Sequence, residues 1–508
     1  MSTLRMITGL DIVAGLILLF ALRGYINSRR RSLLPPGPRP LPVVGNLFDI
    51  PAVKPWVTYT SWGKKYGPIS AVQVFGQSII ILNSVNVIKD LFERRGAFYS
   101  DRFSLPIVDM FGLIEWNFPS QSLSDTWRNG RKITDYGLRA AAVRKYSAVL
   151  QDKAHEFLRM VSKSPTRFTD YISLSTGSIM LQLLYGYQAD SFGDPLLSQS
   201  EESMHILNSS VLPGALLVNT LPLRLPGMGF KILAERCKQL FQNVKRDTYG
   251  YVRSGMRNGT APPSILRDYL EDNQNVDKSS SLDDGVIADA ISSLYGPGVD
   301  TTVSMLKSLF LALALYPNVQ QRSQEELDEV IGVHRLPSFD DRASLPYAEA
   351  VFRELLRWRL AVPLGLPHMT AKDDIYEGYL IPKGSIVWGN TWAILHDPET
   401  YPDPEDFKPE RFLSPDGRVI DDPRLAYAFG YGRRICPGRH LVEQSLWIFT
   451  VSILFAFRVE RAKNEMGHEI PLVCENSDTL VSHPDVFECT ITPRNSRVEE
   501  LINAPSVR

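Results

Sequence analysis

Cysteine is scarce in this sequence, and so is net charge. The 508 residues include four cysteines and carry a formal net charge of −1. No two cysteines form a C-x-x-C pair, so the pattern is not that of a secreted disulfide framework, and a reducing, cytosol-facing compartment fits better. The chain has neither bulk basicity nor an acidic tail, which argues against nucleic acid as a partner.

A glycine-rich dinucleotide-binding motif is also missing. No Gly-x-Gly-x-x-Gly follows an expected strand, and the chain has no room for a separate flavin domain. Electrons for any redox reaction must therefore come from another protein. No internal repeat and no convincing second linker interrupts the body of the chain, so we predict one large domain over residues 46–508.

Long hydrophobic runs are few, and the first lies at the N-terminus. Residues 4–22 are mostly apolar, which is just long enough for a helix that spans a bilayer. Arg23 and Arg29–Arg31 follow it, and this positive charge places the remainder of the chain on the cytosolic side. A cleaved signal peptide is the alternative, but arginines stand where its small-residue cleavage site would be. We predict a membrane anchor over residues 1–28 and a basic, proline-rich connector over residues 29–45.

The rest of the pattern predicts a mainly α protein with smaller β-sheets. A second apolar run, residues 286–316, is apolar on all sides, as is typical of a core helix. Gly296-Pro297-Gly298 is expected to break it, because proline removes an amide and clashes with the preceding turn. We also expect a hairpin over 69–82 with Gly76-Gln77 at its turn, helices over 320–331, 347–360 and 440–455, and strand character over 381–391.

One cysteine has surroundings that suit a thiolate. Cys436 lies within Phe429–Gly438, a stretch with the sequence FGYGRRICPG. Gly432 and Gly438 let the backbone approach a flat ligand closely and adopt a positive φ. A helix expected after Pro437 would direct its N-terminal amides at the sulfur, and positive charge nearby also lowers the pKa of a thiol. That charge is expected from Arg433 and Arg434. A buried structural cysteine in a glycine turn is the alternative.

The same stretch resembles the haem-binding motif of the cytochrome P-450 family, Phe-x-x-Gly-x-Arg-x-Cys-x-Gly. The motif is matched at Phe429, Gly432, Arg434, Cys436 and Gly438. The resemblance covers essentially the whole chain after Pro35, and it implies the cytochrome P-450 fold behind an N-terminal transmembrane helix. It also implies haem b as the cofactor, with Cys436 as the metal ligand, Arg434 paired with a haem propionate and Phe429 near the sulfur. A thiolate ligand pushes electron density to the iron and favours O–O cleavage.

Three further residues match positions at which the family contacts its cofactor. Trp127 and Arg131 are four residues apart on an expected helix and resemble the family's Trp-x-x-x-Arg, in which both donate to a propionate. Paired charge and hydrogen bonds make a buried carboxylate tolerable. His368 stands where related proteins also offer a propionate donor, although an ordinary satisfied core histidine has the same appearance.

A structural network is implied by a second family pattern. Glu354 and Arg357 are three residues apart on an expected helix and therefore share a face. By the resemblance, the pair joins Arg411 in a buried network that fixes the segment leading to Cys436. Removing one member of a buried ion pair costs on the order of 3–5 kcal/mol, so we expect such a substitution to prevent haem incorporation.

The second apolar run contains residues suited to oxygen chemistry. Gly298, Asp300 and Thr301 match the family's Ala/Gly-Gly-x-Asp/Glu-Thr pattern, whereas Pro297 departs from it. Oxygen activation consumes protons, and a positioned donor contributes roughly 10²–10⁴-fold to such a step. We expect Thr301 to hold a water and Asp300 to relay protons from solvent. Pro297 is expected to kink the helix by freeing the carbonyl of Ser293. A kink without a proton relay is the alternative.

The resemblance also implies a lipophilic substrate. Fungal members of the family that act in secondary metabolism share the patterns around Pro367 and Pro398–Phe412, and that group oxidises terpenoid, polyketide or indole skeletons. Residues 204–229 are rich in leucine, proline and glycine, and part of them is expected to enter the bilayer. The expected pocket segments are 103–118, part of 204–226, 291–301, 361–366 and 478–482.

Partners and location follow from the same resemblance. Membrane-bound members take electrons from NADPH–cytochrome P-450 reductase, and O2 is the co-substrate. We expect a single-pass protein of the endoplasmic reticulum whose body faces the cytosol. The glycosylation sequons at Asn208 and Asn258 would then be unused.

Two other functions remain open at this level. The first is a haem-thiolate isomerase or dehydratase that needs neither O2 nor a reductase, although such relatives tend to lack the acid–alcohol pair of Asp300 and Thr301. The second is a haem-binding sensor or carrier without turnover, which would have no need of a proton relay, an apolar pocket and an anchor together.

Overall fold

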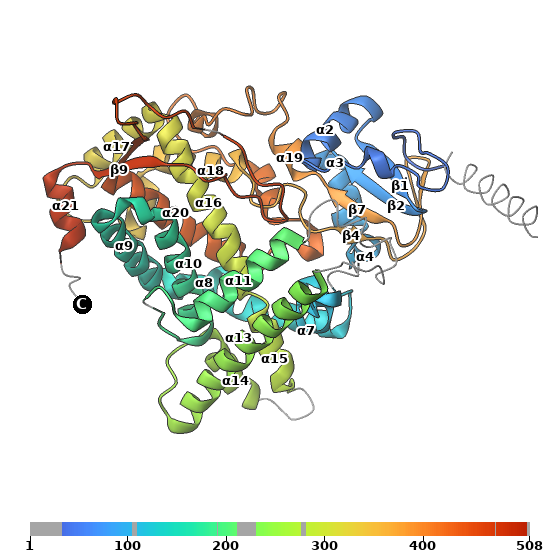
Figure 1. Ribbon diagram of the computed structural model, residues 1–508, viewed down its shortest axis with the longest axis horizontal. Coiled ribbons are helices and arrows are strands. Elements are labelled where there is room, and N and C mark those ends of the chain that lie inside the picture. The colour runs from blue at the N-terminus through green and yellow to red at the C-terminus, as the bar shows by residue number, and fades with distance from the viewer. Residues whose placement is uncertain are drawn as a thin grey trace, which may run out of the picture.

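The structure, a computed structural model, describes residues 33–103, 109–189, 191–210, 230–275, 281–472 and 474–504. The predicted anchor over residues 1–28 lies outside them, as do residues 29–32 of the predicted connector. The described chain is mainly helical with small sheets, as predicted. Figure 1 shows the helices filling most of the molecule, with strands β1, β2, β4 and β7 gathered at one end.

Most of the body is built from long helices. They are α2 Pro55–Tyr66, α7 Asp125–Leu138, α9 Ser147–Lys163, α10 Phe168–Tyr185, α11 Pro195–Ser210, α13 Phe230–Asn258, α14 Ile265–Gln274, α15 Asp284–Ser292, α16 Tyr295–Leu315, α17 Pro317–Val330, α18 Pro346–Trp358, α20 Arg439–Ala456 and α21 Ser496–Asn503. Shorter helices are α3 Val85–Ile88, α4 Gly96–Tyr99, α6 Leu113–Trp116, α8 Ala140–Val143 and α19 Thr391–Leu395. The helices predicted over 320–331, 347–360 and 440–455 correspond to α17, α18 and α20.

The largest sheet joins strands that are far apart in the sequence. Its strands are β1 Ile69–Val74, β2 Gln77–Leu82, β3 Asp101–Arg102, β4 His368–Met369 and β7 Ile386–Gly389. They lie in the order β1-β2-β7-β4-β3, and β2 pairs with β7 in parallel. The short antiparallel pair β3–β4 sets Arg102 directly opposite His368. The sheet therefore brings together two basic residues separated by more than half of the chain.

The predicted hairpin is present, but its turn lies one residue earlier than expected. Val74 pairs with Gln77, so Phe75 and Gly76 form the two-residue turn, with φ angles of 48° and 86°. Two residues with positive φ are typical of a type I′ turn, which matches the twist of the strands. Two small antiparallel pairs complete the strands: β5 Asp374–Tyr376 with β6 Tyr379–Ile381, and β8 Phe457–Arg461 with β9 Cys489–Pro493.

Helix α16 runs through the main hydrophobic core (Figure 1). Its residues Leu306, Leu309 and Phe310 are fully buried, and Phe310 contacts Phe157 of α9 and Phe168 of α10. Among the described residues, the segment 284–315 alone is long and apolar enough to span a membrane, but 67% of its apolar window is buried inside the protein. This burial identifies the segment as the core helix that was predicted.

The core helix is broken, and the break includes Ser293, the residue whose carbonyl Pro297 was expected to free. Helix α15 ends at Ser292 and α16 begins at Tyr295, so Ser293 and Leu294 form the break. Pro297 is the third residue of α16. An amide in the first turn of a helix has no intrahelical acceptor, so proline is tolerated there. The predicted kink is therefore present, but the break itself lies at Ser293 and Leu294, ahead of Gly296-Pro297-Gly298, because the carbonyl four residues before a proline receives no amide from it.

Candidate active site

Cys436 lies in a tight loop immediately before α20. Its amide donates to the carbonyl of Phe429 at 2.8 Å, which closes the loop on itself. Gly432 has φ of 49°, and a Cβ there would lie 2.3 Å from the carbonyl oxygen of Phe92, so only glycine fits. Gly438 differs from the expectation: its φ is −81°, and a Cβ would meet the Cys436 sulfur at an ordinary 3.7 Å. One of the two predicted glycine constraints is therefore present.

The environment of the Cys436 thiol contains opposing influences. Burial raises the pKa of the thiol, and it outweighs the amides of Gly438 and Arg439 together with the charges of Arg131 and Arg439, which lower that pKa. The N-terminal amides of α20 thus act on the sulfur as predicted. The nearby charge comes from Arg131 and Arg439 rather than from Arg433 and Arg434. A metal cation at the sulfur would reverse the balance, because a coordinating thiol is deprotonated.

Arg434 points into a buried group of basic side chains. Its Nε donates to the carbonyl of Ser100 at 2.8 Å and its Nη2 to that of Gln121 at 2.7 Å, whereas its Nη1 is buried without a partner. The guanidinium lies over the Trp127 ring, 4.5 Å from the centroid. Burial lowers the pKa of Arg434 to about 10. An orphaned cationic donor of this kind requires an anionic or polar partner.

Two further basic residues line the same region. Arg102 donates to the carbonyls of Leu366 and Pro367, and burial together with the charge of Arg434 lowers the pKa of Arg102 to about 9. His368 bonds through Nδ1 to the carbonyl of Tyr99 at 2.6 Å, and burial lowers the pKa of His368 well below its usual value. Arg102 was missed in the sequence, because nothing in its local pattern distinguishes it from a surface arginine.

Arg131 and Trp127 share one face of α7 as predicted. The helix is capped by Ser124, whose hydroxyl accepts from the amide of Trp127 at 3.1 Å. Arg131 Nη1 donates to the carbonyl of Ile435, one residue before Cys436, at 2.5 Å. Helix α7 therefore contacts the cysteine loop twice: Arg131 binds the carbonyl of Ile435, and the Trp127 ring lies against Arg434.

The basic residues fit a haem. Within the described part of the chain, no carboxylate forms an ion pair with Arg102 or Arg434. Both side chains are instead turned to backbone carbonyls, and one donor of Arg434 remains unpaired. Haem carries two propionates, which match this surplus of buried positive charge. A thiolate-capable sulfur and carboxylate-binding cations on neighbouring elements form the donor set that such a group requires.

Glu354, Arg357 and Arg411 meet in the protein interior. Arg357 Nε lies 2.7 Å from Glu354 Oε2, and Arg411 Nε lies 3.2 Å from Glu354 Oε1. The side chains of Glu354 and Arg357 are both fully buried. Arg357 also donates to the carbonyls of Leu395 and Asp406, so every arm of the network reaches backbone. The three residues lie together, and their role in haem loading stays a prediction.

Asp300 and Thr301 are neighbours on α16, but they point to different surroundings. The Thr301 hydroxyl donates to the carbonyl of Pro297 at 2.9 Å. Asp300 instead accepts from Asn208 Nδ2 at 2.5 Å and lies 3.1 Å from His483 Nε2. Consecutive helical residues are about 100° apart around the axis, so they cannot share a partner without movement. Sequence reasoning missed Asn208 and His483, because both lie on other elements.

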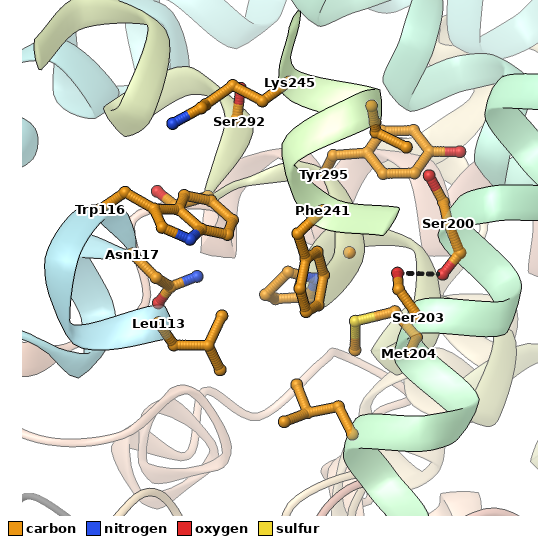
Figure 2. Close-up of a pocket in the computed structure, with 15 residues that line it drawn as sticks. Leu113, Trp116, Asn117, Ser200, Ser203, Met204, Phe241, Lys245, Ser292 and Tyr295 are labelled. Atoms are coloured by element: carbon orange, nitrogen blue, oxygen red, sulfur yellow. Dashed lines mark hydrogen bonds between the residues drawn. The ribbon is translucent and has the colours of Figure 1, made fainter. Parts of the chain in front are cut away.

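Two cavities adjoin α16. The smaller, of about 50 Å³, is lined by α6, α11, α13 and the start of α16, and Figure 2 shows the rings of Trp116, Phe241 and Tyr295 around it. The larger, of about 570 Å³, lies beside Asp300 between α10, α11, α16 and the loop 477–483. The expected pocket segments 103–118, 204–226, 291–301 and 478–482 contribute to these walls, but 361–366 does not. The larger cavity carries charged side chains, contrary to the expected apolar lining.

Comparison with known proteins agrees with this geometry. The cytochrome P450 family model matches residues 35–484. Cytochrome P450 monooxygenase 208 of Postia placenta is 40% identical, covering 98% of this chain and 97% of the relative. Cytochrome P450 monooxygenase claR of Ampulloclitocybe clavipes is 39% identical, covering 99% and 94%. Tryptamine 4-monooxygenase of Psilocybe cyanescens is 35% identical, covering 93% and 96%. The chain therefore belongs to the cytochrome P450 family and is a haem-dependent monooxygenase.

Proposed function

We propose that this monooxygenase uses haem b and inserts one oxygen atom of O2 into a lipophilic small molecule. The observation that carries the proposal is the partly buried Cys436 thiol at the N-terminus of α20, beside basic side chains that include the unpaired Arg434 Nη1. When bound, a haem with a thiolate ligand supplies the activation of dioxygen. Cys436 is the axial ligand in this proposal, and Phe429 packs near its sulfur.

The remaining cofactor contacts are assigned to residues of the basic group. Arg434, Arg131, Trp127 and His368 hold the propionates, and Gly438 lies beside the sulfur of Cys436. Burial lowers the pKa values of Arg434 and His368, because it opposes their charged forms. A bound anion would stabilise those charged forms, which supports propionates as their partners. Arg102 belongs to the same group by its position and charge.

Proton delivery is assigned to α16. Thr301 holds a water through its hydroxyl, and Asp300 passes protons from solvent toward it. The Thr301 hydroxyl donates to the carbonyl of Pro297, and its oxygen can still accept a hydrogen bond from a water, which is compatible with this assignment. Positioned proton donors contribute about 10²–10⁴-fold to steps of this kind.

The substrate class rests on the cavity walls and on the relatives. The smaller cavity has aromatic and aliphatic side chains in its wall beside several serines, Asn117 and Lys245, and its apolar part suits an apolar molecule (Figure 2). One relative is named for action on tryptamine, an indole, and the others are named only as monooxygenases. We assign the substrate to the fungal secondary metabolites, such as terpenoids, polyketides or indole compounds.

Electrons are assigned to NADPH by way of NADPH–cytochrome P-450 reductase. A membrane location supports this pairing, since an anchor over residues 1–28 would hold the chain beside a membrane-bound reductase. We place the protein in the endoplasmic reticulum as a single-pass protein with its body facing the cytosol.

The test is the carbon monoxide difference spectrum of the reduced full-length protein. We expect a strongly red-shifted Soret band in the wild type, because the thiolate donates electron density to the iron. Cys436→Ser should lose this band, whereas Cys474→Ser, at a partly exposed cysteine, should keep it. A haem-loaded wild type without the band would overturn the assignment of Cys436.

A further inference from the structure

The carboxylate of Asp300 is held from two sides on the outer face of α16. Asn208, near the end of α11, donates its Nδ2 proton to Oδ2 at 2.5 Å. His483 places its Nε2 at 3.1 Å from Oδ1. Neither neighbour is needed to hold the core, because each contact is only partly buried. The two contacts fix one carboxylate between a helix and a loop that are distant in the sequence.

The position of His483 is itself fixed by a chain of hydrogen bonds. Ser482 donates its amide to the carbonyl of Ala361 at 2.8 Å, and its carbonyl accepts from the Ser304 hydroxyl of α16 at 2.5 Å. The amide of His483 donates to the Ser477 hydroxyl at 2.9 Å. Ser304 lies one turn beyond Asp300 on the same helix. The imidazole is therefore held against Asp300 by the backbone of its own loop.

Two polar atoms of this group have no partner. His483 Nδ1 and Asn208 Oδ1 are both buried and make no hydrogen bond within the described protein. Both residues line the cavity of about 570 Å³, which is large enough for several waters. Buried polar atoms without protein partners are the usual binding sites of ordered water.

The cavity wall also supplies groups that exchange protons with solvent. The charged and titratable side chains facing it, besides Asp300 and His483, are Asp170 and Arg167 from α10 and its approach, Glu201 and His205 from α11, and Lys307 from α16. Burial raises the pKa of Glu201 and lowers that of Lys307. The cavity wall thus brings charged side chains together with Asp300 and His483.

We propose that His483 is a positioning residue that carries protons from the polar cavity to Asp300. The Nε2–H bond breaks as an O–H bond forms at Asp300 Oδ1, and a cavity water gives a proton to Nδ1. The hydroxide left behind takes a proton from the cavity solvent. The ring then turns into the cavity, where Nε2 gains a proton from solvent and Nδ1 releases one, so the starting tautomer returns and each cycle draws one net proton from solvent. Asn208 holds the other carboxylate oxygen, since an amide donates a hydrogen bond but does not transfer its proton. The inference rests on the role proposed above for Asp300 and Thr301.

A purely structural clamp is the rival explanation, and glutamine separates the two. In His483→Gln the side-chain amide still donates to Asp300 but does not carry a proton. If His483 only holds Asp300, glutamine restores wild-type behaviour and alanine does not. If His483 carries protons, glutamine preserves the thermal unfolding midpoint but does not restore the reduction of O2 to water.

The experiment needs no substrate. The full-length protein with reductase consumes NADPH and O2. The O2 is reduced either to peroxide, which uses one NADPH for each O2, or to water, which uses two NADPH for each O2. Water formation requires O–O cleavage and therefore proton delivery. We expect His483→Gln to slow water formation on the order of 10²-fold and to divert oxygen to peroxide. The carbon monoxide spectrum and the unfolding midpoint should remain those of the wild type.

Controls define what each failure would mean. His334→Gln, at an exposed histidine that lines neither cavity, should leave the peroxide share unchanged. Asp300→Asn should divert oxygen to peroxide as His483→Gln does, and the double variant should be no worse than either. A wild-type peroxide share in His483→Gln would overturn this inference alone. A wild-type share in Asp300→Asn would overturn the proposed role of Asp300 as well.

Discussion

At the scale of single residues, Cys436 combines burial with local positive potential. Burial alone raises the pKa of its thiol, and the amides of Gly438 and Arg439 only partly offset that effect. This balance suits a metal ligand better than a free nucleophile, because the cation itself supplies the charge that stabilises a thiolate. Arg433 and Arg434, predicted as the source of that charge, are replaced in this role by Arg131 and Arg439.

Thr301 and Thr302 offer a matched pair for testing the oxygen-handling residue. Each hydroxyl donates to the carbonyl four residues earlier, at 2.9 Å and 2.8 Å respectively. We expect Thr301→Ala to release peroxide and lose water or product formation about 10²-fold, since it removes a positioned donor. Thr302→Ala loses an equivalent hydrogen bond and should stay coupled. Peroxide and NADPH measured together provide the check, and equal behaviour of the two variants would refute the assignment of Thr301.

At the scale of elements, α16 shows how proline can lie in a core helix. Pro297 is in the first turn, where its missing amide costs no intrahelical bond. The helical interruption falls at Ser293 and Leu294, and Ser293 carries the carbonyl that Pro297 was expected to free. Apolar residues continue through this break, and so the sequence alone suggested one long helix with a kink.

Helix α18 contributes the fully buried half of an ion-pair network. Its Glu354 receives hydrogen bonds from Arg357, from Arg411 and from the amide of Lys408. The helix thereby fixes the segment from which the chain runs on toward Cys436. Buried charges of this kind are costly to separate, although replacing a whole network by apolar groups can be neutral.

Removing Arg357 should therefore affect the whole site. We expect Arg357→Ala to lose about 3–5 kcal/mol of unfolding free energy, because Glu354 would remain buried and unpaired. The variant should accumulate without haem. Arg353→Ala, one turn earlier and paired with Glu349 and Asp421 near the surface, should cost only about 1 kcal/mol or less. Haem content per protein and denaturant unfolding measure both effects, and full haem loading of Arg357→Ala would contradict the prediction.

At the scale of the whole molecule, the site is assembled from distant parts of the chain. Arg102 and His368 meet through β3 and β4, Arg131 reaches the cysteine loop from α7, and Asp300 meets the loop at His483. These contacts depend on the order of strands in the sheet and on the packing of α16. Local sequence patterns carry no information about them.

The proposed membrane attachment is also tested at the scale of the whole molecule. Several large apolar side chains are exposed, including Phe48 at 79% beside the connector and Ile232 at 77% near the start of α13. We expect a variant lacking residues 1–28 to remain partly bound to vesicles, because apolar surface of this kind favours the bilayer interface. Flotation with vesicles measures the bound fraction.

Two outcomes of that experiment are distinguishable. Adding Phe48→Glu and Ile232→Glu to the truncated chain should release it, since charge at the interface opposes insertion. Complete release by the truncation alone would show that the anchor is the sole attachment and that residues 204–229 do not enter the membrane.

The sequence by itself determined the family, the position of Cys436 within the family motif, and the main helices. These follow from a contiguous motif and from local periodicity, since residues close in the chain must be close in space. Only the tertiary structure decided which basic residues surround Arg434, where the core helix breaks, and that Asp300 faces Asn208 and His483. Those features arise from contacts between segments far apart in the chain, and such contacts are set by packing rather than by local pattern.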